Sequence, residues 1–127
     1  MKLLLDTHTL LWWLQKFPSL SKRASRLISE TDNQIFVSAA TGWELAIKSN
    51  SGKLEIGNIL EGFEDALAEE GMSVLPMSME HALRAGRLPN HHKDPFDRML
   101  VAQAQADNLS LISNDKIFER YGVRRVW

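Results

Sequence analysis

Short apolar segments of strand length alternate with longer helix-like segments along the whole chain, and this alternation limits the folds open to it. We expect strands at residues 2–5, 35–37, 74–75, 109–112 and 123–126, and helices at residues 7–14, 20–28, 39–49, 59–69, 78–85, 95–107 and 114–119. Strands made almost entirely of apolar residues are typical of a sheet that is buried on both faces. The pattern therefore predicts an open α/β/α sandwich around a mainly parallel sheet of about four to five short strands.

Size and composition narrow the class of protein further. The chain has 127 residues, 44% of them hydrophobic, which is enough for one core and predicts a single domain over residues 1–127. It has no cysteine, which excludes a disulfide scaffold, a Cys-rich zinc site and a thiol nucleophile. The first apolar run stops at Asp6, and no apolar stretch approaches the ~20 residues that span a bilayer, so we expect a cytoplasmic protein. The net charge of −1 predicts that any nucleic acid is held by local basic groups and bound cations.

Apolar spacing predicts how some side chains of the helices are used. Two sets of residues have the i, i+3, i+4 spacing of one helical face. The first is Trp43, Ala46 and Ile47. The second is Met79, Ala82 and Leu83, and we expect this set to point inward. Trp12 and Trp13 are neighbours in the first helix, so they can hardly both point fully inward. We expect one of them in the core, and the second is a candidate interface residue.

Four acidic residues are expected to meet at one edge of the sheet. Asp6 follows the first strand, Glu44 lies in the first turns of the helix after the second strand, and Asp115 follows the strand at 109–112. Asp97 begins the helix that leads into that strand. A helix before a parallel strand runs opposite to it, so its N-terminus lies where strands end. In such sheets ligands bind outside the carboxyl ends of the strands.

Two interpretations of these acids remain open. Close carboxylates repel by roughly 4 kcal/mol per pair at an effective dielectric near 20, and a hard cation such as Mg²⁺ or Mn²⁺ would relieve this. Such an ion could activate water for attack on a phosphodiester. Alternatively, each acid caps a helix: Thr41 to Glu44 fits a capping box, Asp94 to Asp97 fits an Asp cap with Pro at the first position, and Asp6 and Asp115 complement helix dipoles.

Several segments together resemble the PIN-domain nucleases, and specifically the VapC-like toxins of bacterial toxin–antitoxin pairs. The resemblance covers nearly the whole chain and is carried by LLLDTHTLLWWL, FVSAATGWELAIKSNSGKL, LPNHHKDPFDRMLVAQAQADNLSLISND and YGVRRVW. It implies an endoribonuclease that depends on Mg²⁺ or Mn²⁺, a cognate antitoxin as protein partner, and pairing of subunits as a homodimer.

The resemblance also implies roles for individual residues. The catalytic and metal-binding quartet would be Asp6, Glu44, Asp97 and Asp115, with Asp6 and Asp97 as direct metal ligands and the other two binding directly or through water. Thr7 fits the hydroxyl residue that follows the first acid of the family, and Ser113 fits the small hydroxyl residue before the last. Asp94 could share or take the role of Asp97.

Five further polar residues lie near the acids in the sequence. Lys48, Lys93 and Arg98 are candidates for holding RNA phosphates, although solvated surface charge is the simpler interpretation of each. For His91 and His92 we expect a structural or solvent-facing role, because adjacent histidines point in different directions and no second pair has metal-ligand spacing.

Two other functions are compatible with the same α/β pattern. A phosphoacceptor receiver domain has similar length, but it needs paired acids after its first strand and a lysine after its fifth, and this chain lacks both features. A non-catalytic module that binds a protein partner could keep the fold and its caps, and it predicts that Asp6→Asn leaves the biological effect intact.

Overall fold

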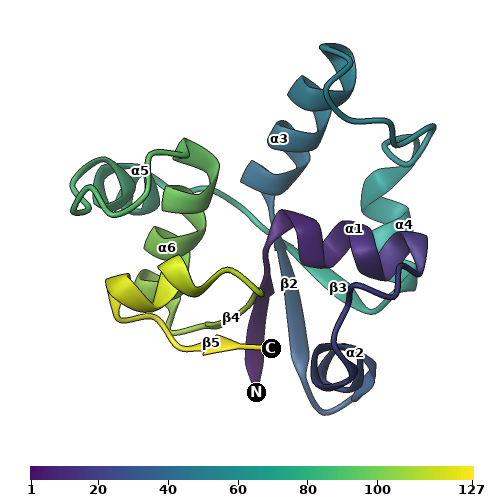
Figure 1. The fold of residues 1–127 in the computed structure, drawn as a ribbon, viewed down its shortest axis with the longest axis horizontal. Helices are drawn as coiled ribbons and strands as arrows, with labels where there is room; N and C mark the ends of the chain where they lie inside the picture. The colour runs from purple at the N-terminus through teal and green to yellow at the C-terminus, as the bar shows by residue number, and fades with distance from the viewer.

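Five strands form one parallel sheet in the computed structural model, which describes residues 1–127, in the order β3-β2-β1-β4-β5 (Figure 1). The strands are β1 (Lys2–Leu5), β2 (Gln34–Ser38), β3 (Met72–Leu75), β4 (Ser110–Ile112) and β5 (Arg125–Val126). The central strand β1 pairs with β2 on one side and β4 on the other, so that Leu5 is level with Val37 and Ile112. The predicted fold class is confirmed, and the sheet is parallel throughout.

Seven helical segments connect the strands: α1 (Thr7–Gln15), α2 (Lys22–Ser29), α3 (Ala39–Asn50), α4 (Phe63–Glu69), α5 (Met79–Gly86), α6 (Pro95–Asp107) and the short 3₁₀ helix η1 (Lys116–Tyr121). Six begin within two residues of the predicted starts. Ser21 caps α2, because its side chain accepts a hydrogen bond from the Ala24 N–H. The helix expected at 59–69 begins only at Phe63. It is preceded by Gly62, whose φ of 58° lies in the left-handed region that glycine adopts without strain. No helix is both long and apolar enough to cross a lipid bilayer.

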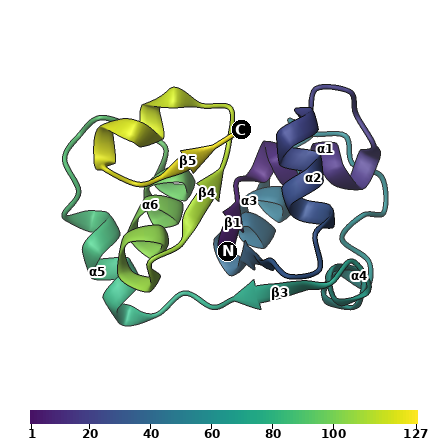
Figure 2. The ribbon, with the colours of Figure 1, turned by 90° about the horizontal axis from the view of Figure 1, so that it is seen from below.

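Helices cover both faces of the sheet (Figures 1 and 2). Successive side chains of β1 point to opposite faces. Leu3 and Leu5 pack into a cluster with residues of α1, α2 and α4, whereas Leu4 packs into a second cluster with residues of α6 and η1. All three leucines are fully buried, which explains why the strand contains no polar residue after Lys2.

Two helix faces are used differently from what apolar spacing suggests. The inward orientation predicted for Met79, Ala82 and Leu83 is wrong, since all three are exposed and α5 instead buries His81 and Ala85. The face of α5 that packs on α6 contains a polar contact, because Nε2 of His81 lies 3.1 Å from Oδ2 of Asp107 in α6. In α3 the set Trp43, Ala46 and Ile47 is likewise exposed, and the buried side of that helix carries Ala40, Thr41, Glu44 and Leu45.

Candidate active site

The carboxyl ends of β1 and β4 form the centre of the candidate site. The chain builds β2 and β3 on one side of β1 and then crosses over to build β4 and β5 on the other. This reversal leaves a crevice at the ends of the two central strands, which is where open α/β sheets bind ligands. Asp6 follows β1 directly, and the segment from Ser113 to Asp115 follows β4.

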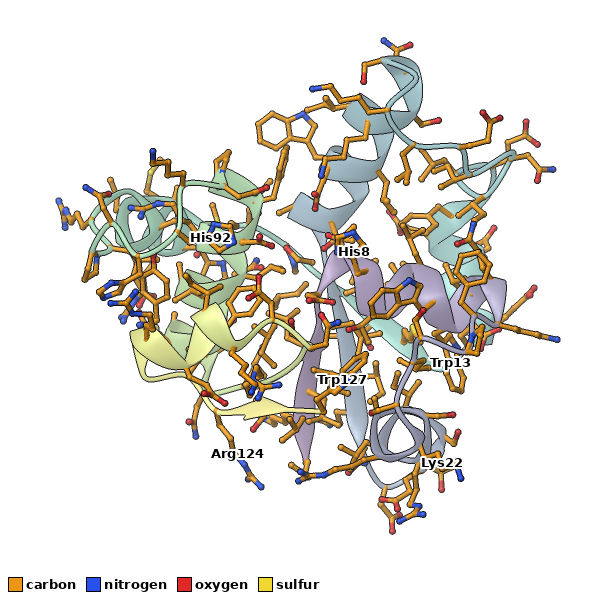
Figure 3. All side chains as sticks on the ribbon, in the orientation of Figure 1. His8, Trp13, Lys22, His92, Arg124 and Trp127 are labelled. Atoms are coloured by element: carbon orange, nitrogen blue, oxygen red, sulfur yellow. The ribbon has the colours of Figure 1, made fainter.

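A pocket of about 470 Å³ opens at this edge and is lined by all four acids of the predicted quartet, Asp6, Glu44, Asp97 and Asp115. Asp94 also lines it. The expected convergence of remote acids is therefore what the fold produces. Figure 3 shows His8, at the start of α1, and His92, beside α6, on two sides of this region.

Asp6 is held rigidly at the start of α1. It is the N-cap residue of the helix, and its Oδ1 atom accepts a hydrogen bond of 2.8 Å from the Thr9 N–H. Its side chain is buried, which raises the pKa of the carboxyl, while hydrogen bonds with Ser113 and Thr9 act in the opposite direction. Asp6 thus caps α1 and also lines the pocket.

Glu44 has no capping role. The N-cap of α3 is Ser38, whose side chain accepts a hydrogen bond from the Ala40 N–H, and the hydroxyl of Thr41 is buried without a partner. The capping box proposed for Thr41 and Glu44 is therefore not formed. Glu44 is only 5% exposed, and its two carboxylate oxygens accept hydrogen bonds from the Thr7 hydroxyl and the Lys48 ammonium.

The pKa of Asp97 responds to every other acid of the pocket. Asp94 caps α6 by accepting hydrogen bonds from the N–H groups of Phe96 and Asp97, which leaves the Asp97 side chain free of a capping role. Burial raises the pKa of Asp97 to about 7, and the negative charges of Asp94, Glu44, Asp6 and Asp115 contribute to this rise in that order of importance. The four other acids of the pocket all act on this one carboxyl.

Asp115 lies at the open side of the pocket. It caps η1 through a hydrogen bond from the Ile117 N–H to its Oδ1 atom, and its own N–H donates to the Ser113 hydroxyl. Its side chain is about half exposed, at 49%. Capping and pocket lining are thus compatible, because only one oxygen of Asp115 is used by the cap.

His92 belongs to the site although the sequence pattern pointed to a structural or solvent-facing role. Its Nε2 atom lies 2.9 Å from Oδ2 of Asp97 and 3.9 Å from Oδ2 of Asp115. Its Nδ1 atom accepts a hydrogen bond from the Asp94 N–H, and its own N–H donates to the Tyr121 hydroxyl. The available signal was its place two residues before the cap of α6, since that places it on the loop at the pocket.

The three basic residues considered for phosphate binding have different environments. Arg98 donates hydrogen bonds to four backbone carbonyls, that of Ala85 at the end of α5 and those of Leu88, Pro89 and His92 in the loop that precedes α6. Its guanidinium therefore holds this loop. Lys93 is exposed and does not line the pocket, whereas Lys48 does line it.

The two neighbouring tryptophans lie in different environments. Trp13 packs against the core cluster of α1, α2 and α4, and its indole N–H donates a hydrogen bond to Oε2 of Glu70. Trp12 lines the acidic pocket, with its ring 5.7 Å from that of His8 and 5.8 Å from that of Trp127, measured between centroids. Neither is fully buried, and Trp12 is the one that borders the site.

The donor set of the pocket fits a hard divalent cation. Five carboxyl groups and one lysine line the pocket, so its formal charge is negative, and carboxylate oxygens are the ligands that such a cation prefers. The present side-chain arrangement has no three His, Asp or Glu residues grouped closely enough to enclose an ion. Glu44 in particular directs both oxygens to Thr7 and Lys48.

Comparison with known proteins identifies relatives of this chain. The model of the PIN domain family matches residues 3–124, which is almost the whole sequence. No curated protein matches it in sequence.

Solved structures with the same fold come from bacterial toxin–antitoxin systems. One such structure is VapBC2 from Rickettsia felis bound to a promoter DNA fragment. A chain of it is 18% identical to this chain, with a TM-score of 0.72, and the match covers 99% of this chain and 98% of that one. A chain of DNA-bound VapBC from Salmonella typhimurium is 21% identical with a TM-score of 0.72, covering 99% and 97%. A chain of a toxin–antitoxin complex from Klebsiella pneumoniae is 21% identical with a TM-score of 0.61, covering 91% and 88%. At this level of identity the similarity establishes the fold.

Proposed function

The chain belongs to the PIN domain family, and from this premise we propose that it is an endoribonuclease, dependent on Mg²⁺ or Mn²⁺, that acts as a VapC-like toxin. PIN domains are generally metal-dependent nucleases. The observation that carries the proposal for this chain is the pocket in which Asp6, Glu44, Asp97 and Asp115 come together. Membership of the family also excludes the phosphoacceptor receiver alternative.

The proposed metal ligands are the four acids of the quartet. Asp6 and Asp97 would bind directly, because one is fixed by its cap and the other has no competing backbone bond. Glu44 and Asp115 would complete the site directly or through water, and Asp94, whose Oδ1 is used by the cap of α6, could share in it. A bound Mg²⁺ or Mn²⁺ would supply an activated water and stabilise charge on a phosphodiester.

The chain's own groups prepare this chemistry by orienting the carboxylates. The Thr7 hydroxyl and Lys48 fix the two oxygens of Glu44, and the Ser113 hydroxyl contributes a hydrogen bond to Asp6. Buried hydrogen bonds of this kind hold a side chain in one rotamer, which is what a preorganised site needs.

RNA cleavage by the purified protein tests the proposal. We expect cleavage with Mg²⁺ or Mn²⁺, none with a chelator, and a loss of at least about 100-fold in Asp6→Asn and Asp97→Asn, because loss of even an outer-shell partner of a metal costs about 10–100-fold. Asp32→Asn is the matched control, since Asp32 is an exposed acid that does not line the pocket. Equal cleavage by the parent and both site variants would contradict the site. A parent that binds an antitoxin but cleaves nothing would favour the non-catalytic binding module.

The proposed partners are a cognate antitoxin and a second copy of the chain. Support for an antitoxin comes from the toxin–antitoxin complexes that share the fold. The groove of about 330 Å³ between α1 and α2, lined by Trp12, Trp13 and Phe17 among others, offers it an apolar surface. A small protein encoded beside this chain should copurify with it and inhibit cleavage, and sedimentation of the chain alone should give the mass of a dimer. A monomeric mass would contradict the homodimer.

A further inference from the structure

We propose that Lys48 is the phosphate-binding residue of this pocket, where its ammonium group binds a non-bridging oxygen of an RNA phosphodiester. This inference rests on the proposed function for the identity of the polyanion, and it adds to that function the group that lets RNA approach an acidic site.

Lys48 is the only lysine or arginine among the residues that line the pocket, whereas five aspartates and glutamates line it. Carboxylates repel a phosphate, so the substrate needs at least one cation from the protein or from bound metal. Arg98 is committed to backbone carbonyls, and Lys93 lies outside the pocket. The positive charge that the chain offers here is therefore that of Lys48.

The ammonium of Lys48 is anchored before any substrate arrives. It donates a hydrogen bond to Oε2 of Glu44, one helical turn earlier in α3, and Glu44 is buried and held at its other oxygen by Thr7. A lysine normally loses much side-chain freedom when it binds an anion. Because Glu44 has already restricted this side chain, the entropic cost of binding a phosphate is reduced.

The same ammonium keeps donors available for a ligand. A lysine ammonium has three N–H donors, and that of Lys48 makes one hydrogen bond within the protein, to Glu44. Its side chain is 36% exposed, so the remaining two donors can be reached from the pocket.

A simpler role for Lys48, as counter-ion to Glu44, makes different predictions. If Lys48 only neutralised Glu44, its removal would make the pocket more negative and weaken RNA binding by repulsion, with the dependence of log K on log salt no shallower than in the parent. If Lys48 binds phosphate, its removal also makes this slope shallower, because one phosphate fewer is neutralised. The salt dependence of binding, measured with a chelator, separates the two roles.

The test is fluorescence anisotropy with a labelled single-stranded oligoribonucleotide, in EDTA, over a series of KCl concentrations. Lys48→Met should weaken binding by about tenfold or more at low salt, and the slope of log K against log salt should become shallower by about 0.7, because the variant neutralises one phosphate fewer. Lys48→Arg should keep both affinity and slope. Lys53→Met is the matched control, since it removes the same charge at an exposed position outside the pocket.

A check on folding keeps the test decisive. Should Lys48→Met fail to fold by circular dichroism, Lys48→Gln replaces it, because its amide is still able to donate to Glu44. A slope in the neutral variants that is no shallower than that of the parent, whether or not affinity falls, or a parent that binds no RNA in EDTA, would overturn the inference. RNA binding that depends on Lys48 in a protein that cleaves no RNA would instead contradict the proposed function alone.

Discussion

Nε2 of His92 lies 2.9 Å from Oδ2 of Asp97, and this contact connects the loop before α6 to a carboxyl of the pocket whose pKa is raised to about 7. Because Nδ1 of His92 accepts a hydrogen bond from the Asp94 N–H, the proton of the neutral ring is on Nε2, the nitrogen nearest the carboxylates. The imidazole is also held through its own backbone by Tyr121. His92 is thus fixed in position beside a proposed metal ligand.

Replacing His92 should weaken metal binding. His92→Phe keeps an aromatic ring but has no nitrogen to donate to Asp97, and we expect Mn²⁺ affinity to fall by about 10–100-fold, the usual effect of removing an outer-shell partner. Calorimetric titration measures this. His91→Phe is the control, because the His91 ring packs edge-on against Tyr121, an arrangement that phenylalanine preserves. Equal Mn²⁺ affinity in His92→Phe and the parent would contradict this role.

The stability of the chelator-treated protein should fall as pH rises. The pKa of Asp97 is about 7 in the folded chain and about 3.9 in an unfolded chain, so the folded protein holds a proton that the unfolded chain has lost. The contribution of Asp97 to the free energy of unfolding is complete below about pH 4 and is lost as pH rises through about 7. It amounts to up to about 4 kcal/mol. Urea unfolding at about pH 5 and about pH 8 tests this. Asp97→Asn should make the difference smaller, leaving the share of Asp6, whose pKa burial also raises. Parallel pH profiles for parent and variant would show that Asp97 is not a cause.

Metal binding should release a proton below neutral pH. A cation that binds Asp97 needs the deprotonated carboxyl, so at about pH 6, below the pKa of about 7, binding displaces close to one proton. Affinity should therefore rise with pH up to about 7 and then level off. Calorimetry in two buffers of different ionisation enthalpy counts the protons. Identical apparent enthalpies in the two buffers at about pH 6 would show that this carboxyl is not involved.

Arg98 should matter for stability and for the loop that carries His92. Its guanidinium donates to four carbonyls between Ala85 and His92, a geometry that a lysine ammonium lacks the donors to reproduce. We expect Arg98→Lys to lower the free energy of unfolding by roughly 1.5–3 kcal/mol, the range for hydrogen bonds to charged groups. Thermal or urea denaturation measures the loss, with Arg87→Lys as a control for an exposed arginine nearby. A loss no larger than that of the control would contradict this role for Arg98.

The amino-acid sequence by itself determined the alternation of strands and helices and the edge at which the acids gather. Leu3, Leu4 and Leu5 are apolar because β1 is buried on both faces, so they identify a central parallel strand without reference to any other segment. Once the sheet is parallel, the positions of Asp6 and Asp115 after their strands follow from chain direction alone.

Only the tertiary structure decided which groups touch which. The spacing of Met79 and Leu83 suggested an inward face, but α5 packs with His81 and Ala85 buried, and His81 contacts Asp107 of α6. Lys48 lies in the pocket, and the distant segment of Thr7 supplies the second partner of Glu44. A periodic pattern reports only the residues within a few turns of one another, whereas these contacts join segments that packing alone brings together. That is the physical reason why the acids could be located from the sequence but their neighbours could not.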